Sequence, residues 1–244
     1  MAKTALILGG TKGLGLSLAF EATNNRRMRA IIAGRSNLHN KPFNSELLKL
    51  DLTDPESVEQ FVRRVPEPFD YIFWVAGNFS RQPFDAMASE CIDDMIATHL
   101  SGPLRSIQLL HLGLAHILRK PYHLVTIAST SSWRIRENEA LYCALKAAKA
   151  SFTRNFAREL VRDLPGSKVT LVNPGGMKTP NFWNESVQDI SNFMDPDVVA
   201  KIIWDEIHEQ KNPFKEIQIM RNDDGSPNVS YGSRLSELPF SEKA

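Results

Sequence analysis

Short apolar runs alternate along this chain with stretches whose apolar residues recur every three or four positions. The runs are near-continuous instead of alternating, which is the pattern of strands buried on both faces of a parallel sheet. They occupy residues 4–8, 30–33, 47–50, 71–75, 124–128, 169–172 and 217–220. The stretches between them have the spacing of helices that pack one face on a sheet. The alternation predicts an α/β fold with a doubly wound parallel sheet of about seven strands flanked by helices.

Two helix starts are marked by an aspartate followed by proline, at Asp54-Pro55 and Asp195-Pro196. Aspartate caps the first turn, and proline suits the first helical position because its missing N–H needs no partner there. Apolar stripes over residues 92–110 and 141–160 predict two long helices, and Pro103 is the place where the first of them can kink. Only residues 34–46 join the second and third apolar runs, so we expect this crossover to lack a proper helix.

No linker rich in proline, glycine or serine divides the chain. We therefore expect residues 1–221 to form one Rossmann-like domain that holds both the cofactor site and the catalytic site. Residues 222–244 are polar and rich in turn-forming residues. We interpret them as a C-terminal tail, or as an arm that lies over a neighbouring subunit.

Composition excludes several classes of function. The 244 residues carry a net charge of +1, which argues against a general binder of nucleic acid or of anionic membranes. Two cysteines, Cys91 and Cys143, are too few for a disulfide framework, so we expect a cytoplasmic protein. The six histidines form no zinc-binding pattern, and we expect no metal site. No stretch has the roughly 20 apolar residues that a membrane span needs.

A glycine-rich turn follows the first apolar run, with Gly9, Gly13 and Gly15 in a GxxxGxG pattern. Glycines at this point allow a tight turn from strand to helix and let a pyrophosphate approach the N–H groups of the helix start. The second run ends at Arg35, where sites for NAD carry an acidic residue that binds the ribose 2′-hydroxyl. Arg35, together with Lys12 in the glycine turn, favours the 2′-phosphate of NADP(H).

A tyrosine and a lysine follow at i and i+4, Tyr142 and Lys146, which puts both on one face of a helix. A nearby ammonium favours tyrosinate, so we expect the pKa of Tyr142 to be lowered and the tyrosine to act as an acid or base. Ser129 ends the fifth apolar run, at the sheet edge where open α/β proteins bind ligands. It is placed to donate a hydrogen bond to a substrate oxygen.

These motifs, in this order, resemble the short-chain dehydrogenase/reductase family over roughly residues 4–210. The resemblance implies catalytic roles for Ser129, Tyr142 and Lys146. It also matches Asp51-Leu52 beside an adenine and Asn173-Pro174-Gly175, followed by Thr179, near a nicotinamide. The expected cofactor-binding residues are Gly9, Thr11, Lys12, Gly13, Leu14, Gly15, Arg35, Asp51, Leu52, Ala76, Gly77, Tyr142, Lys146, Pro174 and Thr179.

The chain departs from the family pattern at two places. The family's Asn-Asn-Ala-Gly reads Trp74-Val75-Ala76-Gly77, which keeps the close approach to a ribose but loses two side-chain amides. The family's active-site asparagine, which holds a water that leads from the lysine to solvent, falls on His99. Two interpretations of His99 stay open: a catalytic group that positions water or relays protons, and a histidine that only packs within a helix.

The resemblance implies hydride transfer between NADP(H) and a carbonyl or secondary alcohol. Alternatives are a non-catalytic NADP(H)-binding redox sensor or scaffold and, less compatible with this length, a nucleotide-sugar epimerase.

The substrate is expected to be a small molecule, and Phe182, Trp183 and Phe193 suit an apolar cover for it, although ordinary packing also explains them. Arg134 and Arg136 either attract an acidic substrate or lie solvated or paired on the surface. The two long helices imply a homodimer or homotetramer.

Overall fold

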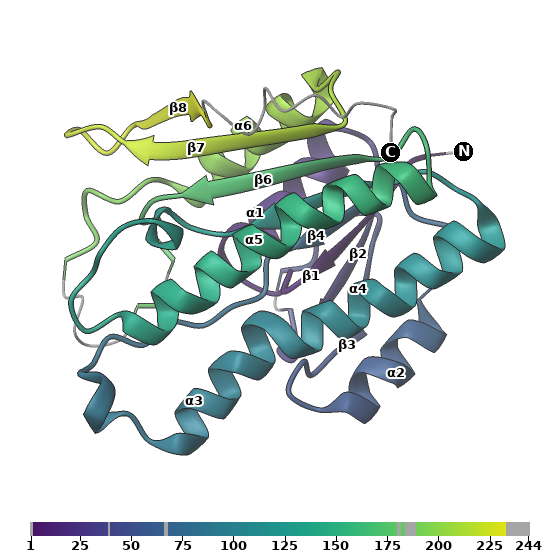
Figure 1. Cartoon of the computed structure of the whole chain (residues 1–244). Helices are drawn as coiled ribbons and strands as arrows, with labels where there is room; N and C mark the ends of the chain where they lie inside the picture. The colour runs from purple at the N-terminus through teal and green to yellow at the C-terminus, as the bar shows by residue number, and fades with distance from the viewer. Residues whose placement is uncertain (1, 39, 66–67, 180–181, 184–188, 233–244) are drawn as a thin grey trace.

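The predicted α/β fold is confirmed in a computed structural model that describes residues 2–38, 40–65, 68–179, 182–183 and 189–232 (Figure 1). Its strands are β1 (Thr4–Leu8), β2 (Arg29–Gly34), β3 (Ser45–Lys49), β4 (Tyr71–Trp74), β5 (His123–Ile127), β6 (Lys168–Pro174), β7 (Phe214–Arg221) and β8 (Pro227–Tyr231). Within the described residues they form one sheet in the order β3-β2-β1-β4-β5-β6-β7-β8. All neighbours are parallel except β7 and β8.

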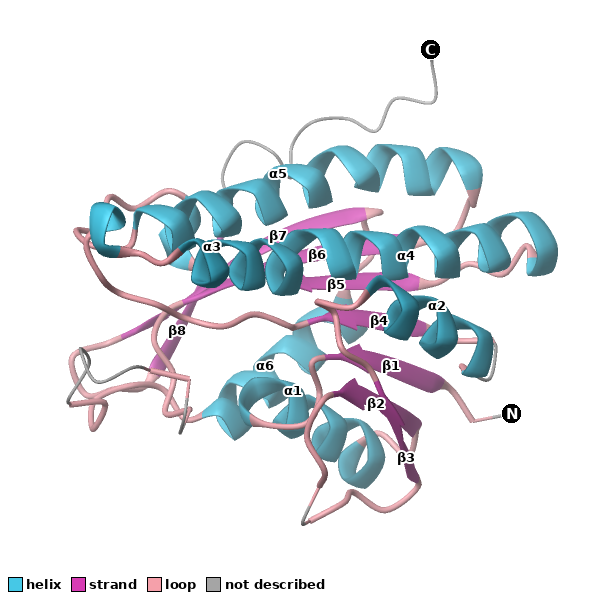
Figure 2. Cartoon of the chain, turned by 90° about the horizontal axis from the view of Figure 1, so that it is seen from below, coloured by secondary structure: helices cyan, strands magenta, loops and turns pink. Residues whose placement is uncertain are grey.

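Helices cover both faces of the sheet, as Figure 2 shows from below. They are α1 (Gly13–Phe20), α2 (Pro55–Arg64), α3 (Ser89–Ile96), α4 (Gly102–Leu112), α5 (Ala140–Asp163) and α6 (Pro196–Glu209). Helices α2, α4 and α5 lie on one face, and α1 and α6 lie on the other. The chain builds outward from β1 first toward β3 and then, from β4, toward β8. The strand order therefore reverses between β1 and β4, which is where open α/β sheets bind ligands.

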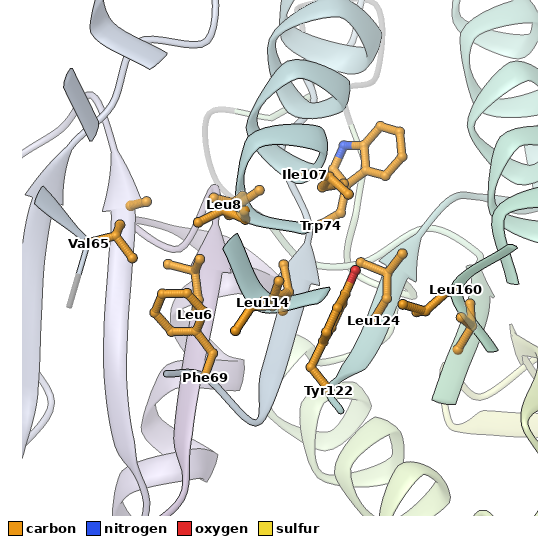
Figure 3. Packing of buried hydrophobic residues seen from close by; sticks show 14 of the residues in the cluster. Leu6, Leu8, Val65, Phe69, Trp74, Ile107, Leu114, Tyr122, Leu124 and Leu160 are labelled. Atoms are coloured by element: carbon orange, nitrogen blue, oxygen red, sulfur yellow. The ribbon is translucent and has the colours of Figure 1, made fainter. Parts of the chain in front are cut away.

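A separate apolar core lies on each face. Leu6, Leu8 and Trp74 belong to one cluster with Ile107 of α4 and with Leu114 in the π-helical turn Gly113–Leu118 that follows α4 (Figure 3). The alternate residues of the same strands point toward α1 and α6, where Trp204 packs on the rings of Tyr71 and Phe73. Because strands buried on both faces have no solvent side, their sequences read as continuous apolar runs. This is the pattern from which the sheet was predicted.

Local signals explain where several helices begin. The Asp54 carboxylate accepts a hydrogen bond from the N–H of Glu56 at the start of α2, and Asp195 does the same with Asp197 at the start of α6. Helices α3 and α4 are joined without a break by a π-helical turn at Ala97–Ser101, immediately before Pro103. The wider turn lies where the proline cannot donate a hydrogen bond, so the helix continues past it.

Three further expectations concern the connections. No residue that the structure describes between β2 and β3 is helical, in agreement with the short crossover. The polar stretch after residue 221 contributes β8, which pairs with β7, while residues 233–244 of the expected tail lie outside the described residues. None of the described helices is both long and apolar enough to span a membrane.

Candidate active site

A cavity of about 840 Å³ opens along the carboxyl ends of the parallel strands. Loops after β1, β2, β4, β5 and β6 line it, so it includes the point where the strand order reverses. Its volume falls within the roughly 300–1,000 Å³ that is usual for ligand pockets. All fifteen residues expected to bind the cofactor line this cavity, and so does Ser129. His99 is not among the lining residues.

The glycine turn brings the start of α1 to the cavity wall. Gly9 has a φ of +90°, and a Cβ added to it would lie 2.6 Å from the backbone nitrogen of Ala76. A Cβ on Gly15 would lie 2.2 Å from the carbonyl oxygen of Gly9. Side chains are therefore sterically excluded at both positions. Among the residues that the structure describes, no side chain caps the first N–H groups of α1, which are therefore suited to an anion. The turn fits the pyrophosphate of a dinucleotide.

Two cations and one carboxylate lie farther along this side of the cavity. Arg35 is 57% exposed, and its guanidinium reaches Asp94 only at 4.0 Å. Lys12 is exposed and also lines the cavity. Burial raises the pKa of Asp51, but hydrogen bonds from Thr53 and the charge of Arg35 outweigh burial and leave this pKa lowered. The loosely held guanidinium of Arg35 fits a 2′-phosphate, because a bidentate acceptor can replace its weak contact.

Ser129, Tyr142 and Lys146 all line the cavity although they come from two parts of the chain. Ser129 follows β5, and its hydroxyl oxygen accepts a hydrogen bond from the N–H of Ser131. Tyr142 and Lys146 lie on α5, and the Lys146 ammonium is 5.5 Å from the centroid of the tyrosine ring. All three side chains are buried. The predicted trio is thus assembled within one enclosed space.

The expected lowering of the Tyr142 pKa is wrong for this structure. Burial raises the pKa of Tyr142, and a hydrogen bond with Ser129 offsets only part of this effect. Burial also lowers the pKa of Lys146 from 10.5 to about 8. The i, i+4 spacing correctly indicates that the two groups are neighbours, but it carries no information about how deeply both are removed from water.

His99 lies in the π-helical turn and is completely buried. Its Nε2 atom is 2.8 Å from the carbonyl oxygen of Asn78 and 3.1 Å from the backbone nitrogen of the same residue, while its Nδ1 atom has no hydrogen-bond partner within the described chain. The ring supports Gly77, where an added Cβ would lie 2.8 Å from the His99 ring. Burial and the charges of Lys146 and Lys149 hold the pKa of His99 well below its ordinary value. A neutral imidazole with one free ring nitrogen results.

Lys149 is a buried group that sequence reasoning missed. Its side chain is fully buried one helical turn after Lys146, and its ammonium donates a hydrogen bond to the carbonyl oxygen of Ala76 at 3.2 Å. Burial, followed by the charge of Lys146, holds its pKa well below the ordinary value. A usable signal existed, since Lys149 occupies a position between Leu145 and Thr153 on the inward face of a predicted helix.

A second buried network fixes the loop after β6. Glu216 of β7 accepts two hydrogen bonds from Arg154 of α5, at 2.8 and 3.0 Å. The Asn173 side-chain amide donates to the same carboxylate at 3.0 Å. Asn173 in turn accepts from Ser132 at 3.4 Å, in the turn that follows Ser129. The asparagine of the Asn-Pro-Gly motif therefore connects three elements beneath the cavity.

Aromatic side chains enclose the cavity beside Tyr142. Phe79 packs edge-to-face on Tyr142 with 5.0 Å between ring centroids, and Trp183 packs on Phe79 at 4.9 Å. Phe182 and Phe193, which were considered as part of an apolar cover, join the same cluster. Phe79 was not singled out from the sequence. Residues 180–181 and 184–188 of the expected covering loop lie outside the described residues.

A doubly wound sheet with a glycine turn at its switch point defines a dinucleotide-binding α/β protein. A sequence profile described as short chain dehydrogenase matches residues 3–189. The chain therefore belongs to the short chain dehydrogenase family, whose members are oxidoreductases that bind a nicotinamide cofactor. This confirms the resemblance inferred from the motifs.

Individual relatives agree with this assignment. An uncharacterized oxidoreductase of Staphylococcus saprophyticus is 28% identical over 192 residues, which cover 73% of this chain and 80% of the relative. One of Staphylococcus aureus is 26% identical over 213 residues, covering 83% of this chain and 90% of the relative.

Solved structures resemble the fold closely. An actinorhodin polyketide ketoreductase with NADPH has a TM-score of 0.77 at 22% identity, covering 92% of this chain and 98% of that one. An alcohol dehydrogenase from Thermococcus sibiricus, complexed with 5-hydroxy-NADP, has a TM-score of 0.75 at 19% identity, covering 93% and 98%. At these identities the likeness establishes the fold.

Proposed function

We propose that this chain is an NADP(H)-dependent oxidoreductase that acts on a carbonyl or secondary alcohol through Ser129, Tyr142 and Lys146. The observation that carries the proposal is the convergence of these three buried side chains on the cavity that also holds the uncapped start of α1. Catalytic groups buried at the carboxyl edge of such a sheet are positioned for ligand chemistry, whereas a surface tyrosine and lysine would be merely solvated.

A nicotinamide cofactor held by the glycine turn, Tyr142 and Lys146 would supply hydride chemistry at the carbonyl or alcohol carbon. In reduction, Ser129 donates a hydrogen bond to the carbonyl oxygen and polarises it. Tyr142 then transfers its phenolic proton to that oxygen, so hydride and proton together yield the alcohol. The raised pKa of Tyr142 keeps this proton in place at neutral pH until the oxygen becomes basic. Lys146 bears positive charge below about pH 8 and stabilises the tyrosinate that remains.

His99 has a supporting role in this proposal. Its Nδ1 atom is a buried ring nitrogen without a partner among the described residues and lies near two lysines, which suits it to hold a water molecule between Lys146 and solvent. We propose this positioning role over direct proton transfer, because the lowered pKa of His99 makes its protonated form scarce.

The preference for NADP(H) rests on Arg35 and Lys12, the two exposed cations beside the adenine side of the cavity.

We also propose a homodimer or homotetramer through α4 and α5. Leu112, Ile117 and Leu118, on α4 and the turn after it, are large apolar side chains exposed in one chain. A solution mass near 27.5 kDa by light scattering would contradict this.

The test is consumption of NADPH and NADH by the purified chain with a panel of ketones, aldehydes and quinones. We expect NADPH-dependent reduction of at least one carbonyl class, and loss of turnover in Tyr142→Phe with NADPH affinity within about twofold of the parent. Retained turnover in Tyr142→Phe would remove the tyrosine from the mechanism. NADPH binding without oxidation across the panel would favour a redox sensor or scaffold.

A further inference from the structure

We propose that the substrate is an aromatic carbonyl compound that carries a carboxylate or another anionic group, which Arg134 and Arg136 bind. This inference rests on the proposed function and names the substrate class of the same site. It follows from two properties of the part of the cavity beyond Tyr142: an aromatic wall next to the reacting hydroxyl, and guanidinium groups at the rim.

The aromatic wall begins at the reacting tyrosine. Phe79 touches the Tyr142 ring edge-to-face, and Trp183 packs against Phe79. The Trp183 ring is fixed from the other side as well, because its indole N–H donates to the carbonyl oxygen of Met177 at 2.8 Å. The backbone of Met177 pairs with Met194 at the base of this segment. A flat apolar ring attached to the substrate carbonyl would find stacking and edge contacts here.

The guanidinium groups belong to the segment that follows Ser129. Arg134 and Arg136 both line the cavity, whereas Ile135 between them is fully exposed and does not line it. Within the part of the chain that the structure describes, neither arginine forms an ion pair. Among these residues the Arg134 side chain has one hydrogen-bond contact, of 3.6 Å to the Sδ atom of Met220. Arginines that line a cavity without a carboxylate partner suit a planar anion.

Other charges around this rim leave the arginines available. Glu139 also lines the cavity, and the charges of Arg136 and Arg81 oppose the effect of burial on the pKa of Glu139. Arg136 and Glu139 do not form an ion pair. Arg221 also lines the cavity and is committed to the Phe193 ring, 5.2 Å away, and to the carbonyl oxygen of Asn192. Asp223 is exposed beside it.

The experiment compares three probes on the full chain with NADPH: 4-acetylbenzoate, its methyl ester, and 4-oxopentanoate. The first is an aromatic anion, the second is aromatic and neutral, and the third is an anion without a ring. We expect 4-acetylbenzoate to exceed each of the others in kcat/KM by about tenfold or more, with the advantage over the ester falling as salt rises. The Arg134→Gln/Arg136→Gln double variant should lose the preference for the acid, measured as the ratio of the kcat/KM values for 4-acetylbenzoate and its ester. Arg158→Gln, an exposed arginine of α5 away from the cavity, is the matched control.

Equal kcat/KM for acid and ester in the parent, or an unchanged preference in the double variant, overturns the proposal. Equal kcat/KM values for 4-acetylbenzoate and 4-oxopentanoate would contradict the claim that the substrate is aromatic. Binding of each probe to the NADPH-loaded chain, measured by calorimetry, separates this inference from the proposed function. If no probe is reduced, tighter binding of the acid that disappears in the double variant still supports the anion site. Equally weak binding of acid and ester overturns it.

Discussion

The ammonium of Lys149 lies 4.5 Å from the ring centroid of Trp74, in the interior of the protein. Both side chains are fully buried, and the carbonyl oxygen of Ala76 accepts the hydrogen bond that the lysine donates. An indole face attracts a cation, so Trp74 partly replaces the water that burial removes from Lys149. Trp74 occupies the position at which the family pattern has an asparagine. In this chain it contacts Lys149, which lies on the same helix as Tyr142 and Lys146.

Burial of Lys149 should make stability depend on pH. Its folded-state pKa lies well below the ordinary 10.5, so the unfolded chain binds more protons and the free energy of unfolding rises with pH toward 10.5. Lys146 adds to this slope between about 8 and 10.5. Each lysine contributes at most about 1.4 kcal/mol per pH unit. Lys149→Met should therefore flatten the rise and raise stability at neutral pH, because methionine fills the space without the charge.

Urea unfolding at a series of pH values between 7 and about 10 measures this slope. Lys211→Met is the control, since Lys211 is exposed and should leave the slope unchanged. An equal slope in Lys149→Met and the parent would mean that the buried amine keeps its ordinary titration.

The reaction should respond to the pKa of Lys146. Because this pKa is lowered to about 8, the ammonium that stabilises tyrosinate is lost as pH rises through 8. We expect kcat for carbonyl reduction to fall above about pH 8, and Lys146→Arg to remove the fall in this range because arginine stays charged. A pH–rate profile measures it. His99 and Tyr142 are shifted away from this range in opposite directions. Lys149→Met should keep the fall; if it does not, Lys149 is the titrating group.

Arg35 should decide the choice between the two nicotinamide cofactors. Among the described residues its exposed guanidinium forms one ion pair, the 4.0 Å contact with Asp94, which a phosphate can replace. We expect Arg35→Gln to weaken NADPH binding by about tenfold or more and to leave NADH binding unchanged, because only NADPH carries the 2′-phosphate. Fluorescence titration with both cofactors gives the two dissociation constants. Arg105→Gln, exposed on α4, is the control, and parallel losses for NADPH and NADH would point to a general disturbance of the site.

The strands predicted from apolar runs were found because burial on both faces leaves a strong compositional pattern. Strand β8 was missed because Pro227–Tyr231 is an antiparallel edge strand whose residues are mostly exposed, so its sequence resembles a turn-rich tail. Motif order and spacing bring the expected cofactor residues to one cavity. Depth of burial is a property of the assembled fold. Burial decides that the pKa of Tyr142 is raised and that Lys149 lies in the interior. Neither property follows from the spacing of residues along a helix.

Substitution of Glu216 should affect both stability and activity, because its carboxylate accepts hydrogen bonds from both Arg154 and Asn173. Glu216→Leu leaves the half-buried guanidinium and a buried amide without their acceptor, which we expect to lower the free energy of unfolding by about 3–5 kcal/mol. Glu216→Gln keeps one oxygen for Asn173 and should cost about 1–3 kcal/mol. Because Asn173 accepts from Ser132 in the Ser129 turn, the glutamine variant should also lower kcat more than it raises KM. Denaturant unfolding and steady-state kinetics test both effects, with the exposed Glu209→Gln as control. An unfolding free energy for Glu216→Leu within about 1 kcal/mol of the parent would show that solvent replaces the carboxylate.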